Sequence, residues 1–79
     1  MTLQELKKKR GFTVEQTFSS DIRLQFKHSN INLAREALQL LKDLGADMAW
    51  DDVNGGKAVG GYYASGTITK KKARELGLI

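Results

Sequence analysis

The spacing of the hydrophobic residues changes along this chain from every second position to a helical repeat, and this change restricts the fold more than any other feature. Residues 12–18 and 22–26 alternate apolar and polar side chains, which predicts two half-buried strands. Residues 33–44 place apolar side chains at positions i, i+4, i+7, i+8 and i+11, the pattern of a helix with one face on a core. The chain is therefore expected to combine a sheet with a long helix.

Facing residues on neighbouring strands must share a face of the sheet, and this rule sets the expected pairing of the first two strands. Both apolar sets match if Phe18 opposes Ile22 and Val14 opposes Phe26. Residues 19–21 then form a three-residue loop. The resulting hairpin has one apolar face and one polar face.

Capping and stop signals bound three helices. Ser, Thr and Asn side chains accept hydrogen bonds from the first free amides of a helix, and glycine adopts the left-handed conformation that often ends it. Thr2 and Glu5 also have the spacing of a capping box. The predicted helices are residues 3–10 between Thr2 and Gly11, the long helix between Ser29 or Asn30 and Gly45, and residues 70–76 between Thr69 or Thr67 and Gly77.

A second hairpin is expected between the long helix and the last one. Large apolar residues alternate with Asp and Ala over 47–51, which predicts a third strand with Trp50 in the core. Asn54-Gly55 is the strongest short signal for a type I′ turn, because both central positions of that turn need a positive φ. A fourth strand is expected to start near Lys57, with Gly60-Gly61 marking a bulge or a close backbone approach.

The order of elements is helix, hairpin, helix, hairpin, helix. We therefore predict an α+β fold, a two-layer sandwich in which an antiparallel sheet of about four strands carries one long central helix, with short basic helices at both termini. At 79 residues the chain is expected to form a single domain, residues 1–79. No segment approaches the ~20 apolar residues of a membrane-spanning helix, so no membrane partner is expected. The absence of cysteine fits a reducing compartment, and a cytoplasmic location is the expectation.

Positive charge is concentrated at the two ends of the sequence. Of 13 lysines and arginines, eight lie in two blocks, and the end segments that contain them carry a net charge of +6 while residues 11–69 carry −2. Concentrated positive charge attracts polyanions, so nucleic acid, either DNA or RNA, is the expected partner. The first block consists of Lys7, Lys8, Lys9 and Arg10, and the second of Lys70, Lys71, Lys72 and Arg74.

The two blocks differ in their relation to the helix dipole. Cations in the last turn of the first helix are stabilised by its carbonyl end, so Lys7–Arg10 have a structural explanation. In the first turn of the last helix the same dipole disfavours three lysines, and free amides there form an anion site. We therefore expect Lys70–Lys72 to contact phosphates. A pair between Lys71 and Glu75 is the structural alternative.

The remaining cations and aromatics indicate how a nucleic acid would be held. Lysine is a compact point charge, which favours backbone contact over base readout, and Arg23 and Lys27 add cations to the polar face of the second strand. Tyr63 is a candidate for stacking on an unpaired base. A sheet-surface tyrosine without that role is the alternative.

No catalytic residue, metal or cofactor is expected. His28 is the only histidine, so a two-histidine metal site is not possible, and its place at the end of a strand favours a packed or edge histidine. The glycines lack the spacing of a phosphate-binding loop. The acidic residues lack the spacing of a calcium loop and are expected to form a solvated edge; they are Asp43, Asp47, Asp51 and Asp52.

Two functions are consistent with these features. The favoured one is a non-catalytic nucleic-acid-binding module, with a regulatory role, that contacts phosphates through its basic terminal helices. The alternative is a small protein-binding inhibitor or adaptor of phage-type format, which docks on a larger nucleic-acid-handling protein complex through its acidic edge or an unpaired strand edge. The small core allows a monomer or a homodimer formed through an edge strand.

Overall fold

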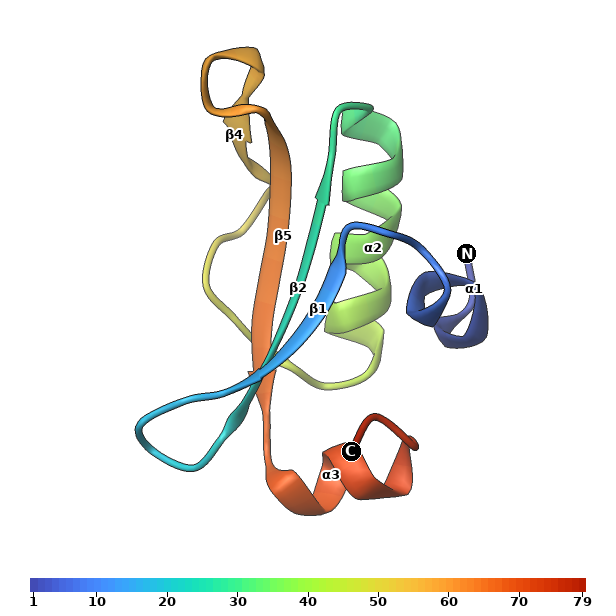
Figure 1. Ribbon diagram of the computed structural model, residues 1–79, viewed down its shortest axis with the longest axis vertical. Helices are drawn as coiled ribbons and strands as arrows, with labels where there is room; N and C mark the ends of the chain where they lie inside the picture. Colours follow the sequence, from blue (N-terminus) through green and yellow to red (C-terminus); the bar gives the residue numbers. More distant parts are fainter.

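Three helices accompany an antiparallel sheet in the computed structural model, which describes residues 1–79, and the longest of them packs along the sheet (Figure 1). They are α1 (Leu3–Lys7), α2 (Ile31–Asp43) and α3 (Lys70–Glu75). Asn30 caps α2, because its Oδ1 accepts a hydrogen bond from the Asn32 amide at 2.9 Å. None of the three helices has the length and apolar composition needed to cross a membrane.

The sheet has five strands, and every pair in it is antiparallel. The strands are β1 (Phe12–Gln16), β2 (Ile22–His28), β3 (Asp47–Met48), β4 (Asn54–Gly56) and β5 (Gly61–Ile68). Their order is β1-β2-β5-β3. β4 also pairs with β5, on the same edge as β3 but near the start of β5, whereas β3 pairs near its end. The predicted α+β class with an antiparallel sheet is confirmed, although the sheet has five strands and not four.

Helix α1 is shorter than predicted, although its N-terminal cap is the expected one. The Glu5 amide donates to Thr2 Oγ1 at 3.2 Å, and the Thr2 amide donates to Glu5 Oε1 at 3.3 Å, so the capping box is complete. The helix ends at Lys7 and not at Arg10. Only the start of the first basic block therefore lies where the dipole of α1 stabilises cations.

Gly11 has a different role from the predicted helix stop. Its φ is not positive, and the Lys27 amide donates to its carbonyl at 3.1 Å. A Cβ at Gly11 would lie 2.0 Å from the Lys27 carbonyl oxygen. The absence of a side chain at Gly11 therefore lets its backbone lie against that of Lys27, next to the first residue pair of β1 and β2.

The β1–β2 hairpin has the predicted faces but a different register. Val14 pairs with Leu24 and not with Phe26, a shift of two residues from the prediction. Because side chains alternate with a period of two, this shift leaves each apolar residue of the strands on its predicted face. The loop becomes longer, and Phe18, predicted to oppose Ile22, is exposed within it.

The longer loop is held by its own hydrogen bonds. The Thr17 amide donates to the Asp21 carbonyl at 2.8 Å, and the Ser20 amide donates to the Thr17 carbonyl at 3.2 Å. Ser20 has a φ of 69°, a left-handed conformation that is uncommon outside turns. Hydrophobic alternation does not encode these local bonds, so it did not predict the register.

The segment between α2 and β5 differs most from the prediction. Asn54-Gly55 does not form the turn of a hairpin but lies in β4, opposite Tyr63 and Tyr62. The chain reverses after β4 through a 3-10 turn, η1 (Lys57–Val59), and Gly60 completes the reversal with a φ of 86°. The strand predicted to start near Lys57 therefore begins later, and Gly60 ends a turn and does not mark a bulge. The alternative prediction, a close backbone approach, is confirmed at Gly61, where a Cβ would lie 3.1 Å from the His28 carbonyl oxygen.

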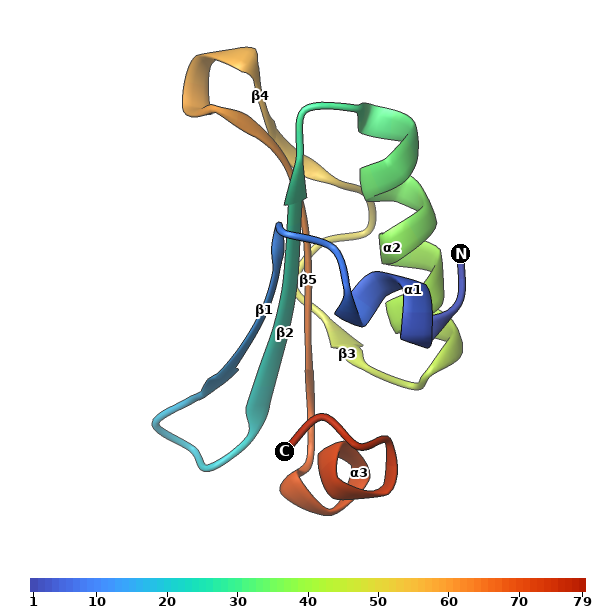
Figure 2. The same cartoon turned by 45° about the vertical axis from the view of Figure 1, so that its right-hand side comes forward.

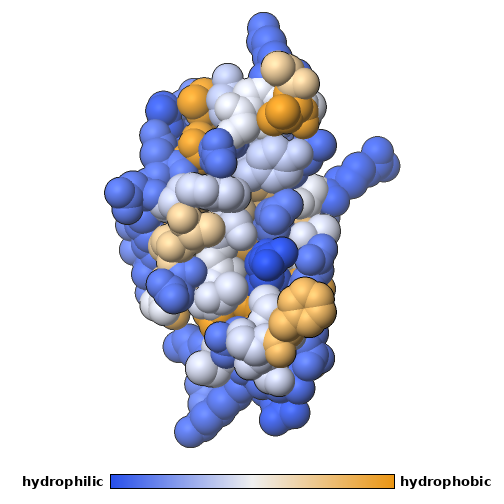
Figure 3. Space-filling model, turned by 90° about the vertical axis from the view of Figure 1, so that its left-hand side faces the viewer, coloured by the Kyte–Doolittle hydropathy of each residue, from blue (hydrophilic) through white to orange (hydrophobic).

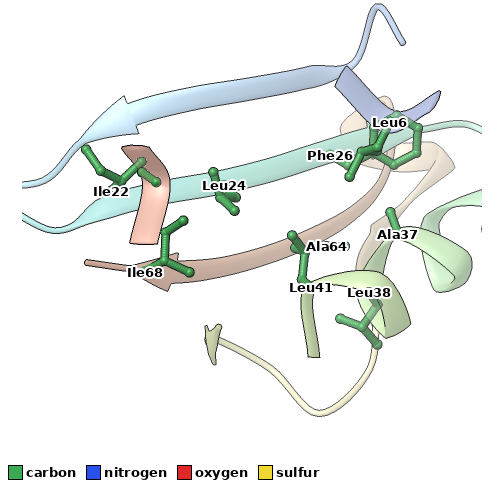
Figure 4. Packing of buried hydrophobic residues seen from close by; sticks show 10 residues of the cluster. Leu6, Ile22, Leu24, Phe26, Ala37, Leu38, Leu41, Ala64 and Ile68 are labelled. Carbon is green, nitrogen blue, oxygen red and sulfur yellow. The ribbon is translucent and has the colours of Figure 1, made fainter. Parts of the chain in front are cut away.

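The hydrophobic core lies between α2 and the sheet, and one residue from each terminal helix closes it. Its buried members are Leu6 from α1, Ile22, Leu24 and Phe26 from β2, Ala37, Leu38 and Leu41 from α2, Ala64 and Ile68 from β5, and Ala73 from α3 (Figure 4). The buried stripe of α2 also includes Ala34, whereas Leu33 and Leu40 of the predicted stripe are half-buried. The buried face of α2 therefore combines two small side chains, Ala34 and Ala37, with two large ones, Leu38 and Leu41.

The opposite face of the sheet has no helix over it (Figure 2). Residues at odd-numbered positions of β2 and β5 point to this side, because the buried residues of β2 have even numbers and side chains alternate. The paired residues there are Arg23 with Thr67, Gln25 with Ser65, and Lys27 with Tyr63. We call this surface the open face.

Replacing Gly11 with alanine is expected to destabilise the protein by about 1–3 kcal/mol, the usual range for overpacking. The added Cβ would meet a backbone oxygen that cannot move without disturbing the pairing of β1 with β2. Urea unfolding followed by circular dichroism measures the free energy of unfolding. Thr13→Ala, at an exposed position of β1, is the control and should change it by less than about 0.5 kcal/mol. A Gly11→Ala variant as stable as the parent would contradict the close approach.

Candidate functional site

The first basic block leaves α1 toward β1, and one of its lysines reaches the other end of the chain. Lys7 Nζ donates to the carbonyl of Gly77 at 3.1 Å. This carbonyl follows α3, where the helix dipole places a partial negative charge that a cation stabilises. Lys8 and Arg10 are exposed, and Lys9 is half-buried. Lys7 therefore holds the first and last segments of the chain together.

The second basic block forms the first turn of α3 and extends to Arg74. The Lys72 amide donates to Thr69 Oγ1 at 3.1 Å, so the cap satisfies one of the amides at the start of the helix. The amides of Lys70 and Lys71 have no partner within the helix. The side chains of Lys71 and Arg74 are exposed, and those of Lys70 and Lys72 are half-buried.

No lysine or arginine of either block forms an ion pair with a carboxylate. The three ion pairs of the structure join the Met1 amine to Glu36, Arg23 to Glu15, and Arg35 to Asp52. The pair between Lys71 and Glu75, which would have explained Lys71 by local stability, is not formed. The charges of both blocks are therefore not compensated by a directly paired carboxylate.

The two blocks are close in the structure but are not one cluster. Figures 1 and 2 both show α1 beside α2, with α3 below them. Lys7 contacts the residue that follows the C-terminal end of α3, whereas Lys70–Lys72 form its N-terminal turn. Because α3 has six residues, its length is about 9 Å. This short helix therefore separates the Lys7 contact from the second block.

Lys72 shares a hollow of about 430 Å³ with two carboxylates. Asp21 from the β1–β2 loop and Asp47 from β3 also line this hollow. Nearby carboxylates attract the lysine and repel an anionic ligand. The other three members of the second block are therefore better placed than Lys72 to contact phosphate.

Tyr63, the residue predicted to stack on a base, lies away from the second block. It is half-buried on the open face, and Lys27 Nζ lies 5.4 Å from the centroid of its ring. At about 3.3 Å per strand residue, Tyr63 lies roughly 20 Å along the chain from Lys70. The cation beside Tyr63 is therefore Lys27 and not a member of either block.

Trp50 lies at the surface and not in the core. β3 ends at Met48, so the alternation that predicted a buried Trp50 stops before it. The Ala49 amide still donates to the Ser65 carbonyl at 3.1 Å, after which the chain leaves the sheet. Trp50 is 41% exposed. The two aspartates that directly follow it, Asp51 and Asp52, could have indicated an exposed Trp50, because charged residues are rarely buried.

His28 and the acidic residues have structural partners or face solvent. The His28 ring stacks on Phe26 with centroids 5.8 Å apart, and its Nδ1 accepts a hydrogen bond from the Asn30 amide at 2.9 Å. Asp43 accepts a hydrogen bond from Gln39 at 2.9 Å. No three His, Asp or Glu side chains come together in a way that could hold a metal ion.

Asp52 is held in its charged form by two neighbours. Arg35 donates to its two carboxylate oxygens at 3.4 and 3.3 Å, and the Val53 amide donates to Oδ1 at 2.7 Å. The hydrogen bond from Arg35 and then that from Val53 lower the pKa of Asp52 below its ordinary value of 3.8. Because Arg35 is on α2, this pair ties the loop before β4 to the helix.

Replacing Arg35 with glutamine should raise the pKa of Asp52 toward 3.8, since the largest cause of its lowering is removed. Nuclear magnetic resonance titration of the carboxyl carbon measures this pKa. A lowered folded-state pKa stabilises the protein above about pH 4, and the gain is lost as the pH falls through the lowered value. Arg35→Gln should reduce this contribution, because the Val53 hydrogen bond remains, whereas Arg23→Gln should leave the pKa of Asp52 unchanged. A parent pKa of 3.8 or higher for Asp52 would contradict the assignment.

Comparison with known proteins adds no relative to this description. No protein-family model, no curated protein and no solved structure matches the chain. The functional argument therefore rests on the chain's own residues and their geometry.

Proposed function

We propose that this protein is a non-catalytic nucleic-acid-binding module that contacts the phosphate backbone through its two basic blocks. The observation that carries the proposal is the lack of any ion pair in the blocks, although the chain contains nine acidic residues. Cations without a paired carboxylate keep their attraction for a polyanion. The exposed members of the blocks are Lys7, Lys8, Arg10, Lys71 and Arg74.

The first turn of α3 is the part of this surface best suited to a phosphate. Lys71 is exposed there, and the amides of Lys70 and Lys71 have no helical partner. The helix dipole disfavours lysines at this end, so local stability does not account for them. Residues that oppose local stability are expected where a function requires them.

Binding of this kind recognises the backbone and not the base sequence. Lysine lacks the planar fork with which arginine reads a base edge, and phosphate contacts position a protein without specifying sequence. Each phosphate contact releases counterions, so the affinity should fall steeply with salt. DNA and RNA both have a phosphate backbone, so either could be the ligand. A protein that covers this backbone would restrict the access of other proteins to it, which would be a regulatory role.

A protein-binding inhibitor or adaptor is the second candidate, and the free edge of β1 supports it. β1 pairs only with β2, so its outer edge has backbone groups without a strand partner. Such an edge can accept a strand from another protein, here a component of a larger nucleic-acid-handling complex. Recovery of one stoichiometric protein partner that survives nuclease treatment would favour this candidate over the first.

Replacing Lys70, Lys71 and Lys72 together with alanine should weaken nucleic-acid binding and reduce its salt dependence. Each lost phosphate contact lowers the slope of log affinity against log salt by about 0.9 for duplex DNA and about 0.7 for a single strand. For two or three lost contacts we expect the slope to fall by about 1.4–2.7. Fluorescence anisotropy of a labelled oligonucleotide of about 12 nucleotides, at several salt concentrations, measures this slope.

The matched control replaces Arg23, Arg35 and Lys42 with alanine. Arg23 was expected to add a cation to the nucleic-acid surface, but it is paired with Glu15 and is no longer counted there. This removes the same charge, but each of these cations already contacts an acidic side chain or a backbone carbonyl of the protein. The control variant should keep a slope close to that of the parent. Equal slopes for the two triple variants, or no binding by the parent at low salt, would contradict the proposed function.

A further inference from the structure

The open face carries a hollow of about 390 Å³ that is lined by aromatic and amide side chains. Its lining residues are Gln25, Trp50, Asn54, Gly55, Val59 and Tyr63. Figure 3 shows this side of the molecule, where hydrophobic patches are separated by pale and hydrophilic side chains. The hollow therefore lies on the sheet face opposite the core and is open to solvent.

Tyr63 is fixed in this hollow by its neighbours. Gly55 of β4 lies directly against the ring, since a Cβ there would be 2.8 Å from Tyr63 Cδ2. The Tyr63 hydroxyl donates to the Val59 carbonyl at 3.4 Å. Trp50 lines the hollow from the loop after β3, and its side chain remains substantially exposed. The two rings thus present aromatic surface that the protein itself does not cover.

Free amide groups and cations accompany the two rings. The side chain of Gln25, half-buried in the middle of β2, is not engaged in a protein hydrogen bond, and Asn54 uses only its Oδ1, which accepts from the Gly55 amide at 2.8 Å. No carboxylate lines the hollow. Lys27 lies over the Tyr63 ring, and Lys57 stands in the turn that joins β4 to β5. The lining of the hollow is therefore uncharged. Lys27 and Lys57 lie near it, and so do Asp51 and Asp52, which follow Trp50 in the chain; Asp52 is already paired with Arg35.

We infer that this hollow binds an unpaired base of a single-stranded nucleic acid. Aromatic side chains on a sheet stack on bases, and amide side chains hydrogen-bond to base edges. Trp50 supplies the stacking surface, Gln25 and Asn54 the hydrogen bonds, and the lysines nearby contact the flanking phosphates. A duplex keeps its bases stacked and paired, so the hollow selects single strands.

This inference rests on the proposed function, because it takes the ligand to be a nucleic acid, and it adds which form of nucleic acid is bound. The neighbouring cations favour a polyanion over an apolar protein surface. Lys70 follows Tyr63 by seven residues, roughly 20 Å along an extended chain, and a single strand of several nucleotides spans that distance. One single strand of ordinary site size can therefore reach both the hollow and α3.

Trp50 is the only tryptophan, so its fluorescence reports directly on the hollow. We would titrate the protein with three probes of about 12 nucleotides: a single strand, an abasic strand and a duplex. Each strand has the same number of phosphates. We expect the single strand to quench Trp50, and the abasic strand and the duplex to bind without quenching. Trp50→Ala should weaken single-strand binding measured by anisotropy by about 5- to 100-fold and leave abasic binding unchanged.

Two further variants separate stacking from structural effects. Trp50→Phe keeps an aromatic ring and should retain most of the preference for the single strand over the abasic strand. Phe18→Ala removes another exposed aromatic, in the β1–β2 loop, and should change neither affinity. Far-ultraviolet circular dichroism confirms that each variant is folded.

The outcomes distinguish this inference from the proposed function. Single-strand binding without Trp50 quenching, or a Trp50→Ala variant with the parental preference for single over abasic strands, overturns the base-binding hollow and leaves backbone binding intact. A Trp50 signal that depends on protein concentration without any oligonucleotide shows that a second copy fills the hollow, which also overturns the inference. Failure of all three probes to bind at low salt overturns both proposals.

Discussion

The packing of α2 against β2 and β5 is the interaction on which the rest of the structure depends. Ala37, Leu38 and Leu41 of the helix share one buried cluster with Phe26 of β2 and Ala64 of β5, and the whole core is built on that side of the sheet. α1 and α3 each add one buried side chain, Leu6 and Ala73, to the same core. These two buried side chains fix where α1 and α3 lie, and the helices in turn fix the positions of the two basic blocks. No lysine or arginine of the blocks belongs to the core itself.

A core on one side of the sheet leaves the other side uncovered. A domain of this size buries only about 60% of the surface its unfolded chain exposes, so it has no second apolar layer for the open face. Strands that are buried on one face only must carry polar residues on the other. Tyr63 of β5 departs from this rule, and Trp50 adds a second ring from the loop after β3. These two rings make the open face a candidate ligand surface.

The charges are distributed in two different ways over the surface. Arginines of β2 and α2 have carboxylate partners, whereas the terminal blocks have none. Lys7 also has no carboxylate partner, but its hydrogen bond to the Gly77 carbonyl links α1 to the end of α3. Held in this way, the terminal segments present cations from two neighbouring elements without any contribution from the open face.

Much of the fold could be predicted because side-chain periodicity is a local property. The α+β class, the faces of β1 and β2, the capping box of Thr2 and the cap of α3 at Thr69 all depend on residues close in sequence. The register of the first hairpin could not be predicted, since a shift of two residues preserves every face. Asn54-Gly55 lies in a strand because pairing with β5 outweighs its local preference for a turn.

The features of the candidate site also fall into two groups, those set by local sequence and those set by long-range packing. The sequence by itself determined the two blocks of positive charge, the helix start beneath the second block, and which strand residues face away from the core, because these depend on charge, capping and alternation. Only the tertiary structure decided that the block cations lack carboxylate partners, that Lys72 shares a hollow with Asp21 and Asp47, and that Trp50 and Tyr63 line one hollow on the open face. Each of these depends on which residues distant in sequence come together, and that is set by how α2 and β5 pack and not by any local pattern.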